Sequence, residues 1–139
     1  MNHFKNTASK SVATLLCILT LTFISQTVSA QSADDAPLKQ AEVMPAFKGG
    51  EDAMMKYLSE SIQYPEEARK KGEEGKVYVG FVIDEKGNVT DAVVKRGVSA
   101  TLNAEALRVI NAMPQWTPGE QDGKKVKVEY VLPVYFKLK

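Results

Sequence analysis

The sequence predicts an α+β domain in which two to three helices pack on a three-stranded antiparallel sheet with strand order 2-1-3. Three observations lead to this fold class. Apolar residues recur at helical spacing in separate segments, one strand is apolar on both of its faces, and the final segment alternates strictly between apolar and polar positions. The strand that is apolar on both faces belongs in the middle of the sheet, and the helices cover one face.

Residues 1–30 have the layout of a secretory signal peptide. Two lysines precede an apolar run over residues 12–24, and Val28-Ser29-Ala30 follows it. A run of this length reaches only about 20 Å as a helix, which is short of a hydrocarbon core of about 30 Å. We therefore expect cleavage after residue 30 and a periplasmic protein. Retention as an inner-membrane anchor through residues 11–25 is the less favoured alternative.

The composition of the remaining chain excludes most enzyme chemistry. The only His and the only Cys lie within residues 1–30, and the 18 basic and 17 acidic side chains of the whole chain nearly balance. This excludes Cys–His and Ser–His–Asp nucleophiles, His- or Cys-ligated metal sites and disulfides. A neutral chain also lacks the clustered positive charge that nucleic acids require. We therefore expect no catalytic residue, no metal and no cofactor, and we do not expect an enzyme.

Residues 31–44 predict a flexible leader, because they are polar and show no periodicity. The folded domain is expected over residues 45–139. Its first segment, residues 45–50, ends in Gly49-Gly50, which marks the entry to a helix over about residues 51–62. Apolar residues of this helix recur at helical spacing: Met54, Met55, Leu58 and Ile62.

A second, short helix is predicted directly after the first. Tyr64-Pro65 ends the first helix and starts the second, because proline restricts the residue before it and suits an early helical position. Gly72 closes this helix. The next segment, residues 76–83, is the doubly apolar strand, and the face expected to contact the helices carries Val77, Val79, Phe81 and Ile83.

A turn over residues 84–88 predicts a hairpin into a second strand over residues 89–96. A third helix follows, with Thr101 or Asn103 as the expected N-cap and Pro114 as the stop. One face of this helix is apolar: Leu102, Ala106, Val109, Ile110 and Met113.

The last strand is expected over residues 126–138, after a loop that contains Pro118-Gly119 and Asp122-Gly123. Its even-numbered positions are apolar, and its odd-numbered positions are mostly polar or charged. Pro133 has no N–H to donate, so this strand belongs at an edge of the sheet.

Five motifs in this order resemble the C-terminal domain of the TonB family. They are Tyr64-Pro65-x-x-Ala68, the strand motif from Glu74-Gly75 to Gly87-x-Val89, Leu102-Asn103-x-Glu105-Ala106, Trp116-x-Pro118-Gly119 and Pro133-Val134-x-Phe136-x-Leu138. The resemblance runs from about Pro45 to Leu138, and Pro-x-Phe-x-Gly-Gly before the first helix is similar to one subgroup of the family. The family's fold agrees with the fold class predicted above.

The resemblance implies a periplasmic domain that captures the TonB box, a short extended segment of outer-membrane transporters, in energy-dependent transport. An exposed sheet edge can bind such a segment as an added strand. The candidate partner-binding residues are those of the edge strand and of the segment that the family uses beside the box: Gln63, Tyr64, Pro65, Glu129, Tyr130, Val131, Leu132, Pro133, Val134 and Tyr135.

A second function class remains open at this point. Family members that transmit force have a membrane helix with a histidine and a long Pro-rich spacer, and this chain shows neither, so we expect a stand-alone domain that binds. The alternative is a periplasmic interaction or scaffold domain that binds another envelope partner or a second copy of itself. The sequence names neither the transporter nor its substrate.

Overall fold

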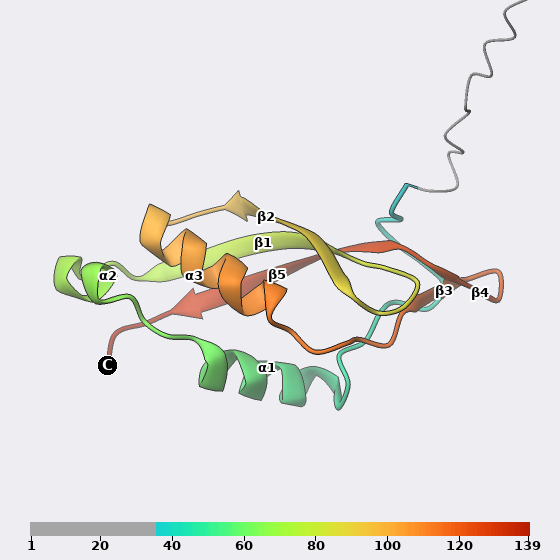
Figure 1. Ribbon diagram of the computed structural model, residues 1–139, viewed down its shortest axis with the longest axis horizontal. Coiled ribbons are helices and arrows are strands. Elements are labelled where there is room, and N and C mark those ends of the chain that lie inside the picture. The colour runs from blue at the N-terminus through green and yellow to red at the C-terminus, as the bar shows by residue number, and fades with distance from the viewer. Residues whose placement is uncertain (1–35) are drawn as a thin grey trace, which may run out of the picture. The chain divides into compact units, whose positions relative to one another are not determined.

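The computed structural model describes residues 36–139, so the predicted signal peptide lies outside the described residues (Figure 1). The elements in chain order are α1 (Gly50–Ser61), α2 (Glu66–Lys71), β1 (Gly75–Ile83), β2 (Val89–Arg96), α3 (Ala100–Asn111), β3 (Gly119–Gln121), β4 (Lys124–Val126) and β5 (Val128–Phe136). Within the described range, no helix is both long enough and apolar enough to cross a bilayer.

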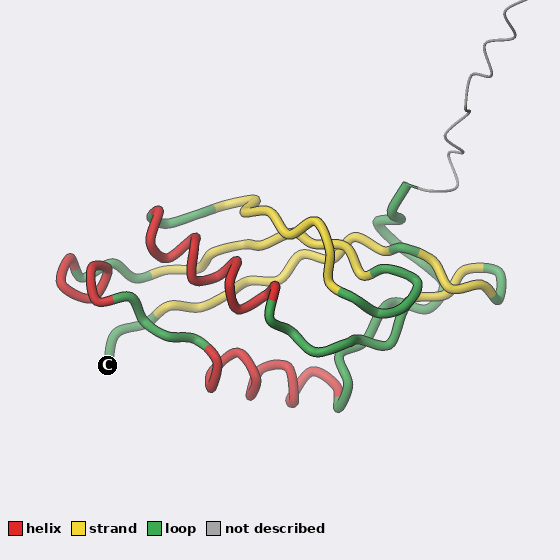
Figure 2. The backbone as a smooth tube through the Cα atoms, viewed as in Figure 1, coloured by secondary structure: helices red, strands yellow, loops and turns green. Residues whose placement is uncertain are grey.

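The main sheet has the order β2-β1-β5 with antiparallel neighbours, which confirms the predicted fold class and the predicted central strand (Figure 2). β1 and β5 pair without a register shift from Gly75↔Phe136 to Ile83↔Val128. The pairing of β1 with β2 is irregular in two places. The two sides of β1 therefore differ in regularity.

The core lies between the sheet and the helices on one of its faces (Figure 1). The predicted inward face of β1 is confirmed, because all four of its apolar side chains are buried: Val77, Val79, Phe81 and Ile83. Trp116 is also buried. Of the two methionines that recur at helical spacing in α1, Met54 is buried, whereas Met55 is 48% exposed.

The final segment differs from the single strand predicted over residues 126–138. It divides into β4 and β5, and β4 forms a hairpin with β3. The hairpin turn contains Asp122 and Gly123, whose φ angles of 51° and 74° are both positive, as a type I′ hairpin turn requires. Strands of three residues are too short to show a periodicity, so the sequence pattern did not reveal this hairpin.

The expected N-caps of α3, Thr101 and Asn103, are wrong. The helix begins at Ala100, and the hydroxyl of Ser99 accepts a hydrogen bond from the N–H of Leu102 at 3.3 Å. Ser99 has the extended backbone of an N-cap residue. The side chain of Asn103 instead accepts from the preceding loop.

Residues 36–46, which we call the arm, run along the domain before α1. Backbone hydrogen bonds join Leu38 to β5, Val43 to β3, and Ala46 to the loop that precedes β3. The flexibility predicted for residues 31–44 stays a prediction. Where the structure describes this segment, it contacts the edge of the sheet that the sequence analysis singled out.

Candidate functional site

The outer edge of β5 is the centre of the candidate site. Leu38 forms a parallel bridge there: its N–H donates to the carbonyl of Lys127 at 2.9 Å, and the N–H of Glu129 donates to its carbonyl at 2.7 Å. The backbone groups of residue 129 therefore point away from β1. Successive residues of a strand direct these groups to opposite edges, and the β1–β5 ladder contains no shift. The backbone groups of Val131, Pro133 and Tyr135 consequently point outward as well.

This geometry confirms the expectation that β5 is an edge strand. It also places the ring nitrogen of Pro133, which carries no hydrogen, on the side away from β1. Among residues 36–139, no strand pairs with the outer side of β5 beyond Glu129. The stretch from Val131 to Tyr135 thus offers unpaired N–H and C=O groups at the surface.

The structure divides the predicted edge residues into two sets. Glu129, Val131, Pro133 and Tyr135 present their backbone groups outward. By the same alternation, the backbone groups of Tyr130, Leu132 and Val134 face β1, where these residues pair with Phe81, Val79 and Val77. The side chains of Leu132 and Val134 are buried. Residues of this second set can support the edge, but their backbone groups are engaged by the sheet.

The predicted segment Gln63-Tyr64-Pro65 links α1 to α2 and reaches the C-terminal end of β5. The ring of Tyr64 packs edge-on against Phe136, with centroids 5.9 Å apart, and its hydroxyl donates to the carbonyl of Glu73. Burial, and then the charges of Glu74 and Glu73, raise the pKa of Tyr64 above its ordinary value. Tyr64 therefore anchors this linker at one end of the candidate edge.

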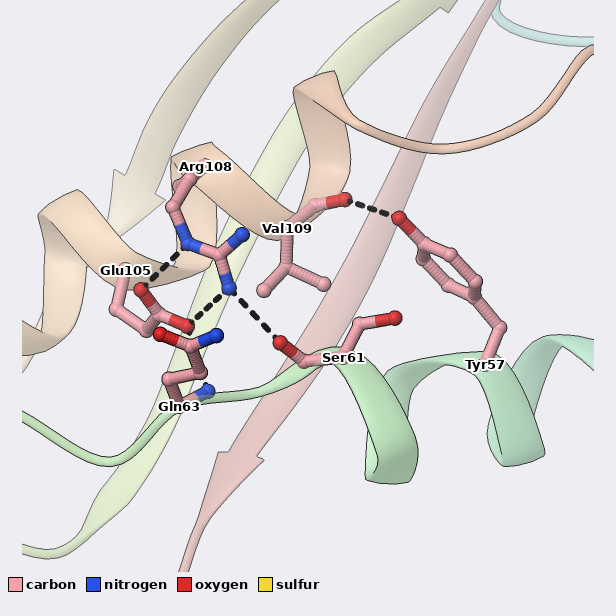
Figure 3. A network of polar contacts seen from close by, with 6 residues as sticks. All are labelled: Tyr57, Ser61, Gln63, Glu105, Arg108 and Val109. Atoms are coloured by element: carbon pink, nitrogen blue, oxygen red, sulfur yellow. Dashed lines mark hydrogen bonds and ion pairs between the residues drawn. The ribbon is translucent and has the colours of Figure 1, made fainter.

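A charged network holds the same linker against α3 (Figure 3). The carboxylate of Glu105 accepts from the N–H of Gln63 at 2.7 Å and from Arg108 at 2.7 and 2.8 Å. Arg108 also donates to the carbonyl of Ser61 at 2.8 Å. The hydrogen bond from Arg108, with a smaller effect from Gln63, holds the pKa of Glu105 below its ordinary value against the effect of burial.

The face of the sheet opposite the helices carries a link between its two outer strands. The ammonium of Lys95 in β2 lies 3.1 Å from the carboxylate of Glu129 in β5. Its aliphatic stem passes over Gly80 in β1, where an added Cβ would lie 2.4 Å from Lys95 Cε. Gly80 leaves the room that this crossing needs.

A cavity of about 430 Å³ adjoins the outer edge of β5. Residues of the arm and of the strand line it: Lys39, Met44, Glu129, Tyr130 and Val131. The sequence analysis missed Lys39 and Met44, because the arm has no periodicity and its approach to β5 depends on contacts distant in sequence. Within the described range, no cluster of three or more His, Cys, Asp or Glu residues could hold a metal ion.

A family comparison accounts for this arrangement of helices and strands. The model of the family described as Gram-negative bacterial TonB protein C-terminal matches residues 60–138, which is more than half of the chain. The chain belongs to the TonB C-terminal family. The match covers the linker, the main sheet and α3, whereas residues 36–59, which include the arm, lie outside it.

Individual TonB relatives agree with the family match. Protein TonB of Helicobacter pylori is 34% identical over 83 residues, which cover 59% of this chain and 28% of the relative. This chain therefore spans little more than a quarter of the length of that curated relative.

Solved structures of TonB C-terminal domains are similar to this chain. A solution NMR structure of an H. pylori TonB C-terminal domain has a TM-score of 0.48 and 30% identity, covering 62% of this chain and 78% of that one. A second solution NMR structure of the H. pylori TonB C-terminal domain has a TM-score of 0.50 and 29% identity, covering 63% and 92%. This second structure shows that the three-stranded sheet with its helices is the fold of the TonB C-terminal domain.

Proposed function

We propose that this domain binds the TonB box of an outer-membrane transporter in the periplasm, by adding that extended segment as a fourth strand at the outer edge of β5. The proposed role is a binding step in energy-dependent transport across the outer membrane, without catalysis. Membership of the TonB C-terminal family supports this partner class. The name of the H. pylori relative, Protein TonB, supports the same assignment.

The observation that carries the proposal is the outward direction of the backbone groups of Val131, Pro133 and Tyr135. A strand edge in regular register, with unpaired donors and acceptors, can bind an extended peptide through main-chain hydrogen bonds. A few such bonds at about 1 kcal/mol each give weak, reversible capture. Reversibility suits a domain that has to release its partner after each transport event.

Replacement of Val131 by proline tests the proposal. The N–H of Val131 points away from β1, so the variant loses an outward donor while the ladder with β1 stays intact. We expect the affinity for a labelled TonB-box peptide, taken from a transporter of the same genome, to fall roughly tenfold or more. Fluorescence anisotropy measures the affinity, and a thermal melt checks that the variant is folded.

Pro133→Ala is the matched control, because it restores a donor on the same edge. We expect this variant to bind the peptide at least as tightly as the wild type. Equal affinity of the wild type and a folded Val131→Pro variant would exclude strand addition at this edge.

A second candidate is the scaffold role, in which the open face of the sheet binds another envelope protein or a second copy of this chain. Exposed apolar side chains on this face favour it: Val93 is 49% exposed, Val131 48% and Tyr135 53%. Sedimentation equilibrium distinguishes the two roles, since a homodimer formed through this face requires self-association in the absence of any peptide.

A further inference from the structure

We propose that the arm and β5 together form a specificity pocket, which accepts one large apolar side chain of the partner strand and favours an acidic residue beside it. This inference rests on the proposed function, because the pocket adjoins the edge at which the strand would add. It goes further in assigning a role to Lys39 and Met44, which lie outside the segment that matches the TonB family.

The position of the cavity follows from the path of the arm. Leu38 occupies the outward carbonyl of Lys127 and the outward N–H of Glu129, and the chain then leaves the edge before Val43 pairs with β3. The cavity of about 430 Å³ lies where the arm has diverged, between its residues 39 and 44 and strand residues 129–131. A volume of this size is within the range of about 300 to 1,000 Å³ that is usual for binding pockets.

The lining of the cavity combines apolar side chains with two charged ones, Lys39 and Glu129. Met44 is 40% exposed and Val131 is 48% exposed, so both present apolar surface to an incoming side chain. Glu129 already pairs with Lys95 at 3.1 Å. Within residues 36–139, Lys39 takes part in none of the ion pairs. The uncompensated charge among the lining residues is therefore positive.

The occupant that fits is an extended peptide, because one wall of the cavity is a strand edge. The bridge at Leu38 shows that the neighbouring position of this edge accepts backbone pairing in the folded protein. A segment that pairs with the edge at Val131 places one of its residues next to the space between the arm and β5. A large apolar side chain fills that space, and an adjacent carboxylate complements Lys39.

The first test fills the cavity with a large side chain. Met44→Trp should weaken binding of the labelled TonB-box peptide roughly tenfold, because the apolar side chain of the peptide loses its burial. Met55→Trp is the matched control, since Met55 is an exposed methionine of α1 that does not line the cavity. Alanine variants of the peptide locate the side chain that enters the cavity. At one apolar position of the peptide, the alanine substitution should lower the affinity for the wild-type protein. The same substitution should not further lower the affinity for Met44→Trp.

The second test reverses the charge of Lys39 and does not depend on how Met44→Trp folds. Lys39→Glu should lower the affinity of the protein for the wild-type peptide. A peptide variant in which one acidic residue is replaced by lysine should restore that affinity. Equal binding by wild type, Met44→Trp and Lys39→Glu would overturn the pocket while leaving strand addition intact. That outcome is identified when Val131→Pro loses binding of the peptide while Met44→Trp and Lys39→Glu keep it. A wild-type protein that binds no TonB-box peptide would overturn both proposals.

Discussion

The two edge strands of the sheet differ in how regularly their backbone groups are arranged for pairing with another strand. β5 pairs with β1 in unbroken register, whereas the pairing of β2 with β1 shifts in two places. Asp91 within β2 also has a positive φ of 52°. An irregular edge strand cannot present an even row of donors and acceptors, so it resists strand addition. The regular edge therefore offers the even row of backbone groups that the proposed strand addition needs, and the arm and Pro133 limit which of these groups are open.

The two edges of the sheet share β1 as a common support. β1 pairs with both outer strands, and the ion pair between Lys95 and Glu129 joins those strands across it. At the C-terminal end of β5, the linker between the first two helices adds a second support, because Tyr64 packs on Phe136. Three substitutions separate these contributions.

The largest effect is expected from the shared central strand. Phe81 is 1% exposed and contacts the rings of Trp116 and Tyr130. Phe81→Ala should lower the free energy of unfolding by about 3–5 kcal/mol, because it removes a buried ring and leaves a cavity. Urea denaturation measures the loss. Val93→Ala, on the exposed face of β2, is the control, and a Phe81→Ala loss no larger than that of the control would contradict the buried face described above.

An intermediate effect is expected from the network that holds the linker between α1 and α2 against α3. Glu105→Gln should lower the free energy of unfolding by about 1 kcal/mol at pH 7, because Arg108 and Gln63 lose a charged acceptor. The pKa of Glu105 is lowered in the folded state, so its contribution is present above the ordinary value of about 4.3 and is lost as the pH falls through the folded pKa. Urea titrations of both proteins at pH 7 and in acid test this. If the difference in the free energy of unfolding between wild type and Glu105→Gln does not shrink in acid, the charge of Glu105 is excluded as its source.

The smallest effect is expected from the link between the two edges. Lys95→Met keeps the aliphatic stem over Gly80 and removes the ammonium that pairs with Glu129. Both side chains are partly exposed, so the free energy of unfolding should fall by only about 0.2–1 kcal/mol. Added salt should reduce the difference between variant and wild type in thermal melts. A difference that is independent of salt would indicate that packing over Gly80, rather than the ion pair, joins the strands.

Hydrophobic patterning was sufficient to predict the first and third helices, the central strand and the buried face of the last strand, whereas Tyr64-Pro65 and Gly72 predicted the short second helix. Val77, Val79, Phe81 and Ile83 are buried because alternation places them on one face, and this property belongs to the local chain. Pro133 likewise predicted an edge, because a missing N–H is a covalent feature. The cap of α3 and the β3–β4 hairpin were not predicted, since several neighbouring polar residues satisfy the same local rule and the hairpin's strands are short.

The partners of individual residues were decided by the tertiary structure. Glu129 donates a backbone hydrogen bond to Leu38, and its carboxylate forms an ion pair with Lys95 of the other outer strand. Both contacts join segments that are distant in the sequence. Such contacts depend on strand register and on the path of the arm, which no local spacing specifies. The sequence by itself determined that β5 is an edge. Only the tertiary structure decided which backbone groups of that edge point outward, because this direction is set by the hydrogen bonds to β1 and Leu38.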